Sequence, residues 1–332
     1  MSEDADSAVA ALQERVRKAA QDGEGLAVTG GDTKSFLGRV SRGTPCSVRA
    51  VQGVVHYEPT ELVVTVRAGT RLTELESTLA QSGQMLPFEP PAFGEGATIG
   101  GTIACGLSGP CRPYRGAARD FVLGVRCING KGESLRFGGE VMKNVAGYDV
   151  SRLMAGAMGT LGILTEISLK VLPRPACSQT RTFEMPGEPA SELMTSFLGR
   201  SLPVSAAAYL DGVLWVRLSG SEAAVSTAAG ALGGDREAEG DAFWSQLKEH
   251  RLDFFSHDSP LWRISLKPQN DVIHFPGKTL IDWGGAQYWV KSDAGFEALS
   301  ELVRPYGGYI TGFGSRDQGA RSDVPQDAVL KL

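Results

Sequence analysis

The amino-acid sequence predicts an α+β protein built from two domains. Its 332 residues exceed what one domain usually needs, since domains most often hold about 100–150 residues. Both halves of the chain mix helical and strand-like patterns, and the texture of the sequence changes after Pro175. We therefore expect a first domain over residues 1–176 and a smaller α+β domain over residues 177–332.

Apolar spacing and turn residues predict the elements of the first domain. In chain order, these are a helix over 8–20, a strand over 25–31, a strand over 61–69, a helix over 70–83, an extended connector over 84–93, a hairpin over 121–139, and a short helix, a turn and an alternating strand before 175. Val9, Leu12 and Val16 share one face of the first helix. Gly83 follows the second helix, where helix ends favour a left-handed residue. Asn129–Gly130 predicts the turn of the hairpin.

The second domain shows the same mixture of elements. We expect helices over 191–200, 221–234 and 241–250, a hairpin over 206–220, and strands around 261–267, 279–283 and 286–290. The hairpin turns through Asp211–Gly212, a pair that two-residue turns favour.

Glycine is the outlier of the composition: it makes up 42 of the 332 residues, about twice the usual share of roughly 7%. Three glycine-rich stretches lie in the first domain, at residues 28–38, 96–104 and 156–166. Backbone N–H groups freed by glycine turns form concave sites for anions, so the first stretch suits a diphosphate. The second stretch is apolar apart from its threonines, which suits a flat ring. Each stretch taken singly also fits an ordinary turn, and none has the spacing of the G-x-G-x-x-G dinucleotide motif.

Charge and cysteine usage exclude several classes of function. A formal charge of −5 argues against general nucleic-acid binding, which needs a basic face. The five cysteines are widely spaced with no C-x-x-C pair, so no zinc or iron–sulfur site is expected. The acidic N-terminus lacks the order of a signal peptide, and no apolar run could span a bilayer. We expect a cytoplasmic protein whose membrane association would come through partner subunits.

Three segments, at residues 57–91, 98–125 and 147–173, resemble in order and spacing the FAD-binding domain of the PCMH-type, or vanillyl-alcohol oxidase, flavoproteins. The match covers residues 25–175 almost continuously. Further stretches, including "LWRISL" and "IDWGGAQYWV" in the second domain, are similar to the FAD-binding E subunits of bacterial glycolate oxidases. The resemblance implies a two-part PCMH-type FAD-binding domain followed by an α+β cap domain.

The resemblance also implies which residues contact FAD. The first glycine loop would clasp the pyrophosphate, the second would follow the flavin and ribityl chain, and the strand after "GTLG" would touch the adenine or ribityl side. The residues carried over in this way are Gly30, Gly31, Asp32, Thr33, Lys34, Ser35, Thr98, Gly100, Gly101, Gly109, Gly116, Gly162 and Ile163. The first loop has no histidine of the kind that tethers flavin in some relatives, so we expect non-covalent FAD.

The sequence departs from its relatives where substrate chemistry is expected. It lacks the histidine-rich segment that holds metal and catalytic residues in related dehydrogenases, and its four histidines form no cluster, so no metal and no catalytic base is assigned. We expect each histidine to be at the surface or hydrogen-bonded. Arg263, Lys267 and Arg316 are candidates for binding a substrate carboxylate, against the alternative of ordinary surface cations. The C-terminal tail by which relatives return to the FAD domain is also missing.

The function implied is that of an FAD-binding subunit in a glycolate oxidase complex. It would take part in oxidising glycolate or a related 2-hydroxy acid to the 2-oxo acid. Its partners would be a sister FAD-binding subunit and an iron–sulfur subunit that carries the electrons onward. Two alternatives stay open: a self-sufficient FAD-dependent oxidoreductase of alcohols or hydroxy acids, and a non-catalytic assembly subunit with a structural flavin.

Overall fold

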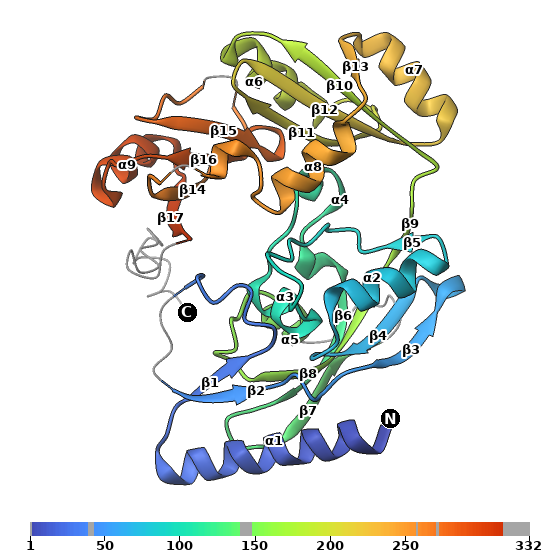
Figure 1. Cartoon of the computed structure of the whole chain (residues 1–332), viewed down its shortest axis with the longest axis vertical. Coiled ribbons are helices and arrows are strands. Elements are labelled where there is room, and N and C mark those ends of the chain that lie inside the picture. The colour runs from blue at the N-terminus through green and yellow to red at the C-terminus, as the bar shows by residue number, and fades with distance from the viewer. Residues whose placement is uncertain (1, 39–42, 140–147, 257, 270–271, 315–332) are drawn as a thin grey trace. The chain divides into compact units, whose positions relative to one another are not determined.

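A computed structural model describes residues 2–38, 43–139, 148–256, 258–269 and 272–314 of the chain (Figure 1). The chain divides into two compact units. Unit 1 comprises residues 1–35, 40–109 and 116–174, and unit 2 comprises residues 36–39, 110–115 and 175–332. Unit 2 thus takes two short segments, residues 36–39 and 110–115, from within the predicted first domain.

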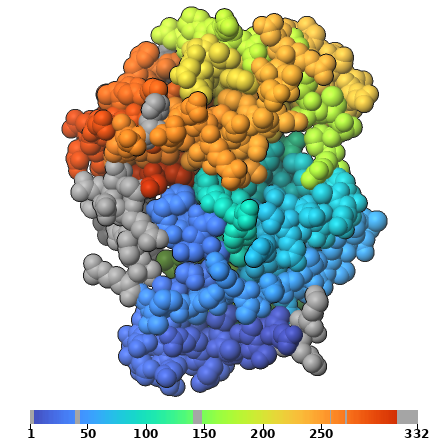
Figure 2. All heavy atoms as spheres, viewed as in Figure 1, coloured from blue at the N-terminus to red at the C-terminus, as the bar shows by residue number. Residues whose placement is uncertain are grey.

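Unit 1 is built on an antiparallel sheet with the strand order β3-β4-β8-β6-β7. Its strands are β3 (Val54–Glu58), β4 (Val63–Arg67), β6 (Val122–Ile128), β7 (Ser134–Gly138) and β8 (Ile163–Lys170). Helices α2 (Leu72–Gln81), α3 (Ile99–Cys105) and α5 (Val150–Met154) pack against one core of this sheet. Helix α1 (Ser2–Asp22) and the parallel pair β1 (Leu26–Thr29) and β2 (Thr44–Ser47) enclose a second core with Ile128 and Ile163. In the space-filling view, the atoms of α1 form one continuous face of this unit (Figure 2, dark blue).

The leucines of α2 face the core, as their spacing predicts. Leu72, Leu75 and Leu79 are all buried against the sheet, and Gly83 has a left-handed φ of 64° just after the helix. The expectation of an alternating strand before Pro173 is wrong, because β8 lies in the middle of the sheet and is buried on both faces. A central strand covered on both sides needs no polar alternation.

The second glycine stretch is a helix, which the sequence analysis did not predict. Helix α3 begins after Thr98, whose side chain accepts a hydrogen bond from the Gly101 N–H at 3.3 Å, and it ends at Gly106 in the left-handed conformation. Gly100 lies inside this helix, and it must be a glycine because a β-carbon there would be 2.7 Å from the β-carbon of Ala68. Close packing of α3 on the end of β4 therefore outweighs the low helix propensity of glycine.

The two predicted hairpin turns differ. Asp211 and Gly212 both have positive φ, 48° and 84°, as a two-residue turn between β11 and β12 requires. Asn129–Gly130 lies in the hairpin turn between β6 and β7 as predicted, but the loop runs from Asn129 to Glu133 and places Gly132, with φ 75°, in the left-handed region. The Asn129 side chain accepts hydrogen bonds from the N–H groups of Lys131 and Glu133, which stabilises this wider loop.

Unit 2 is built on an antiparallel eight-stranded sheet with the order β13-β10-β12-β11-β15-β16-β14-β17 (Figure 1). Its strands are β10 (Cys177–Glu184), β11 (Val204–Leu210), β12 (Val213–Gly220), β13 (Asp235–Glu237), β14 (Leu261–Ser265), β15 (Lys278–Asp282), β16 (Gln287–Lys291) and β17 (Tyr309–Phe313). Its helices are α4 (Arg112–Arg115), α6 (Gly187–Phe197), α7 (Glu222–Leu232), α8 (Gly240–Lys248) and α9 (Phe296–Val303). Helices α6, α7 and α9 contribute to the core on one side of this sheet.

The remaining elements are short. A two-stranded antiparallel pair joins β5 (Gln84–Met85) to β9 (Leu172–Pro173). Single turns of 3-10 helix cover Pro59–Glu61, Ala118–Phe121, Asp253–Ser256, Trp283–Gly285 and Arg304–Tyr306. Residues 315–332, which include Arg316, lie outside the described residues.

Candidate functional site

A row of backbone N–H groups in unit 1 has no acceptor within the described part of the chain. These groups belong to four consecutive residues, Gly30 to Thr33, in the loop that follows β1. Asp32 has a left-handed φ of 59°, and such a change of hand turns successive N–H groups toward one side. The loop therefore offers donors to an anion, as the first glycine stretch predicted.

Arg49 holds this loop from the opposite side. Its guanidinium donates to the carbonyl oxygens of Gly30 at 2.8 Å and Gly31 at 3.2 Å. The contact follows from the parallel pairing of β1 with β2, which sets Thr29 beside Ser47 and so brings the residues two positions further on together. Arg49 was not predicted from the sequence, because only this register places it beside the glycines.

The side chains of the loop bind a neighbouring segment of the chain. The Thr33 hydroxyl donates to the Ala92 carbonyl at 2.8 Å, and the buried Lys34 ammonium donates to the same oxygen at 3.1 Å. The Ser35 hydroxyl donates back to the Asp32 carbonyl at 3.3 Å. In this structure Lys34 thus ties the proline-rich connector to the loop.

Two of the predicted glycines are required by the protein itself. A β-carbon on Gly31 would lie 1.6 Å from the Gly96 carbonyl oxygen, and one on Gly30 would lie 2.3 Å from the Thr98 hydroxyl. The first and second glycine stretches therefore contact each other directly. This contact joins the loop after β1 to the N-terminus of α3.

Gly101 is different, because little in the protein requires it to be a glycine. It lies inside α3, where glycine costs about 1 kcal/mol relative to alanine. A β-carbon there would meet only the Thr98 hydroxyl within 4 Å, at 3.3 Å. The space beside Gly101 is a cradle that a side chain would fill, which fits a flat group lying against the helix.

The other predicted glycines have local reasons. A β-carbon on Gly109 would lie 2.4 Å from the Glu89 carbonyl oxygen. Gly116 has a φ of 118°, which an L side chain rarely adopts. Neither residue by itself indicates a ligand.

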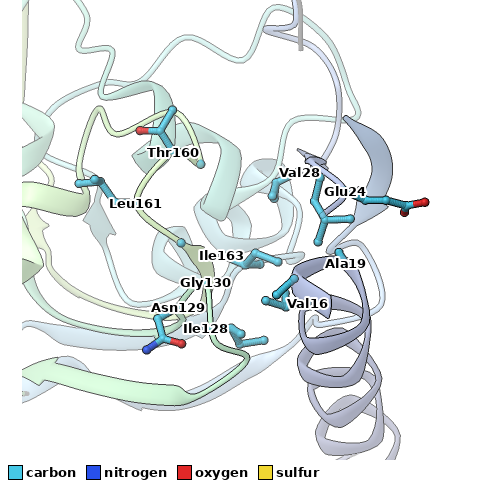
Figure 3. Close-up of a pocket in the computed structure, with 14 residues that line it drawn as sticks. Val16, Ala19, Glu24, Val28, Ile128, Asn129, Gly130, Thr160, Leu161 and Ile163 are labelled. Atoms are coloured by element: carbon cyan, nitrogen blue, oxygen red, sulfur yellow. The ribbon is translucent and has the colours of Figure 1, made fainter. Parts of the chain in front are cut away.

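Gly162 and Ile163 line a cavity of about 240 Å³ in unit 1. Figure 3 shows Val16 of α1 facing Ile128 and Ile163 across it, with Val28 of β1 beside them. Pockets for whole drug-sized ligands span about 300–1,000 Å³, so this one suits part of a larger molecule. Its lining combines apolar side chains such as Val16, Ile128 and Ile163 with the polar residues Glu24, Asn129 and Thr160.

The predicted carboxylate-binding residues differ in their surroundings. Arg263 lies on β14 and is partly buried among tryptophan rings, whereas Lys267 is exposed beyond the end of that strand. Arg316 lies outside the described residues. Only Arg263 is therefore placed among side chains that could form a site.

The histidines of the described part also differ from one another. His56 and His274 are exposed. His250 is instead packed against Phe255, with ring centres 4.1 Å apart, and burial lowers its pKa to about 3. The aromatic packing of His250 was not predicted from the sequence.

Three observations apply to the described residues as a set. Within that set, no group of three histidine, cysteine, aspartate or glutamate side chains could hold a metal ion. None of the helices described there is long and apolar enough to cross a bilayer. None of the five cysteines, all of which are described, forms a disulfide bond.

Comparisons with known proteins agree with this arrangement. A family model described as an FAD binding domain matches residues 7–138. The glycolate oxidase subunit GlcE of Escherichia coli (strain K12) is 50% identical over 309 residues, covering 93% of this chain and 88% of that protein. Similarity to a D-lactate dehydrogenase of Anaerostipes hadrus is confined to 137 residues at 33% identity, or 41% of this chain and 28% of that protein.

A solved structure shares the fold over both units. The alkyldihydroxyacetonephosphate synthase superposes with a TM-score of 0.64 at 18% identity, covering 90% of this chain and 69% of that one. At this identity the likeness concerns the fold alone. Because half of the residues are identical along most of both chains, this protein belongs to the family of glycolate oxidase subunit GlcE and has an FAD binding domain.

Proposed function

We propose that this chain is the FAD-binding subunit of a glycolate oxidase complex and takes part in oxidising glycolate or a related 2-hydroxy acid to the 2-oxo acid. The observation that carries the proposal is the row of N–H groups from Gly30 to Thr33, held by Arg49, in a chain half identical to GlcE. We assign FAD binding to the first domain and contact with substrate or partners to the second.

We propose a place in unit 1 for each part of FAD. The N–H groups of Gly30 to Thr33 would hold the diphosphate, and the cradle beside Gly101 would take the flavin or ribityl chain. The cavity lined by Gly162 and Ile163, with both apolar and polar side chains in its wall, would take the adenine. When bound, FAD supplies the acceptor for the hydride that leaves the hydroxyl-bearing carbon of the substrate. Because no described side chain is assigned as a covalent link, we propose non-covalent binding.

We further propose that electrons leave through partner subunits. The E. coli relative is named as a subunit, which supports a complex of several chains. The partners we propose are a sister FAD-binding subunit and an iron–sulfur subunit. The complex would be located in the cytoplasm, with membrane association through those partners.

The decisive experiment is an absorbance spectrum of the purified chain, reconstituted with FAD, before and after anaerobic addition of glycolate. A flavin spectrum that bleaches assigns substrate oxidation to this chain. A flavin spectrum that stays oxidised assigns the oxidation to a partner and leaves this chain as an accessory flavoprotein. Failure to bind FAD would overturn the proposal.

Arg49→Met makes the same experiment specific to the proposed loop. Loss of hydrogen bonds that hold a charged-ligand site costs about 1.5–3 kcal/mol, so we expect FAD affinity to fall by about tenfold or more. Arg71→Met, at an exposed arginine of the same unit, is the matched control and should bind FAD as the unmodified chain does.

A further inference from the structure

The face of the unit 2 sheet that carries Arg263 gathers aromatic and cationic side chains. Arg263 on β14 pairs with Trp289 on β16 and with Thr311 on β17, so the three side chains share one face of the sheet. The core face of β14 is formed instead by Trp262 and Ile264, which are buried. Arg263 therefore projects away from the hydrophobic core.

The Arg263 guanidinium forms hydrogen bonds within the described part of the protein through its Nε only. Its Nε donates to Gln287 Oε1 at 2.7 Å, and the Gln287 amide donates in turn to Asp282 Oδ2 at 3.4 Å. Asp282 Oδ1 accepts from the Trp283 N–H at 2.7 Å. No residue in the described ranges accepts a hydrogen bond from the two terminal nitrogens of Arg263 or forms an ion pair with it.

Terminal nitrogens without a hydrogen-bond acceptor are not a general feature of arginines on this sheet, as Arg217 in the same unit shows. Arg217 also lies over a tryptophan, with its guanidinium carbon 5.4 Å from the ring centre of Trp244. Its Nε donates to the Ser205 hydroxyl at 2.9 Å, and a terminal nitrogen donates to the Ser205 carbonyl. Arg217 is thus satisfied within the protein, whereas the terminal nitrogens of Arg263 are available to a ligand.

Trp283 forms a wall beside these nitrogens in an unusual backbone conformation. It is 4% exposed and has a φ of 54°, which is rare for a bulky L residue. The guanidinium carbons of Arg112 and Arg263 lie 4.3 Å and 5.0 Å from its ring centre. Strained residues of this kind cluster at ligand sites, where the surrounding structure holds them in place.

The charges around Arg263 favour an anion. Desolvation lowers the pKa of Arg263 to about 10, Tyr309 and Asp282 act to raise it, and Arg112 acts to lower it. Of the described carboxylates, Asp282 is the one whose charge acts on Arg263, and it stands against two guanidinium groups. One additional negative charge would balance this group.

We propose that Arg263 binds the carboxylate of a small monocarboxylic acid through its two terminal nitrogens, with Gln287 and Asp282 as positioning residues and Trp283 as a wall of the site. A planar carboxylate matches the two parallel donors of a guanidinium. The choice of a 2-hydroxy or 2-oxo acid as ligand rests on the proposed function. The residues of the site all belong to unit 2.

Tryptophan fluorescence can test this site directly, because all five tryptophans of the chain lie in unit 2. The full chain, with and without FAD, is titrated with glycolate and with glycolamide, a neutral molecule of the same size. We expect saturable binding of glycolate at about 1 mM or below, the usual range for enzyme substrates. Glycolamide should bind at least about tenfold more weakly. Equal responses to both molecules, or none to glycolate, would overturn the proposal.

Two variants separate ligand binding from packing. Arg263→Lys keeps the charge but loses the paired donors, so glycolate affinity should fall by about tenfold or more. Arg217→Lys is the matched control and should bind glycolate normally. If Arg263→Lys does not fold, Gln287→Met provides the test, because it keeps the volume of the side chain and removes the acceptor for Nε. Unchanged glycolate affinity in a folded Arg263→Lys or Gln287→Met chain would refute the assigned roles.

FAD binding, followed by absorbance on the same samples, distinguishes the two proposals. A chain that binds glycolate but not FAD would contradict the proposed function and leave the Arg263 site standing. A chain that binds FAD but not glycolate would contradict the Arg263 site alone.

Discussion

Glycines in this protein occur for two reasons: some leave room for another part of the chain, and others are proposed to leave room for a ligand. At Gly31 the neighbour is the chain itself, since the Gly96 carbonyl occupies the place of a side chain. At Gly101 the space is open apart from one hydroxyl, yet a helix interior favours alanine there. The sequence shows both residues in similar glycine-rich stretches, and only the packing around them separates a folding requirement from a ligand requirement.

This difference gives a prediction for Gly101→Ala. The added methyl group should raise helix propensity, so we expect the free energy of unfolding to stay the same or to increase by up to about 1 kcal/mol. The same methyl group would occupy the proposed flavin cradle, so FAD affinity should fall by at least about tenfold. Thermal unfolding and FAD titration measure the two effects separately.

The matched control is Gly230→Ala in α7. Gly230 also lies in a helix and has no atom within 4 Å of the place of its missing β-carbon. It should show the change in stability without any change in FAD affinity. Normal FAD binding by Gly101→Ala would mean that the cradle is not the cofactor site.

His250 predicts an acid sensitivity of unit 2. Its pKa is lowered from an ordinary 6.5 to about 3 by burial, followed by the charges of Arg263 and Lys291. Between these pH values the unfolded chain binds the additional proton, so stability is complete above pH 6.5 and is lost as the pH falls toward 3. At pH 5 the loss should be about 2 kcal/mol.

Unfolding followed by tryptophan fluorescence at pH 7 and pH 5 measures this loss. His250→Phe keeps an aromatic ring beside Phe255 and cannot take up the proton, so its stability should depend less on pH. His274→Phe, at an exposed histidine of the same unit, should respond to acid as the unmodified chain does. Equal acid sensitivity in all three proteins would contradict the prediction.

At the scale of elements, the two predicted hairpins show where local sequence signals hold. Asp211–Gly212 joins two strands that pair directly up to the turn, so both residues take the left-handed conformation. Asn129 binds the backbone of its own loop instead, and the left-handed position moves to Gly132. The same kind of dipeptide therefore has two outcomes, decided by side-chain hydrogen bonds that spacing does not reveal.

A matched pair of alanine substitutions tests this assignment. Gly212→Ala places a side chain at a φ of 84°, so we expect a destabilisation of about 1–2 kcal/mol. Gly130→Ala meets no atom within 4 Å and lies outside the left-handed region, so it should be neutral or stabilising by up to about 1 kcal/mol. Denaturant unfolding measures both, and equal losses would contradict the two turn geometries.

At the scale of the whole molecule, the sequence predicts elements better than their partners. The leucines of α2 and the first glycine loop could be located from spacing alone. Strand β10 could not, because its residues are mostly polar and its place is set by pairing with β12. Arg49 and Gln287 were missed for the same physical reason, since strand registers bring them to Gly30 and Arg263. Contacts between distant segments depend on such registers, which one sequence does not show.

The division into two units leads to a last prediction. Because the proposed FAD contacts all lie in unit 1 and the five tryptophans all lie in unit 2, two probes can follow the units separately. FAD at about 100 times its dissociation constant should stabilise the unit that binds it by about 2.7 kcal/mol. For a unit of this size that corresponds to a rise of about 5–10 °C in melting temperature.

Calorimetry should show this rise in the unfolding transition of unit 1. The unfolding transition of unit 2, which tryptophan fluorescence follows, should move little. Glycolate without FAD should have the opposite effect, because its proposed site at Arg263 belongs to unit 2. Arg49→Met should reduce only the response to FAD, and Arg263→Lys only the response to glycolate. If FAD raised the tryptophan-detected transition as much as the other, its binding energy would not be confined to unit 1, and the assignment of the cofactor site to that unit alone would be wrong.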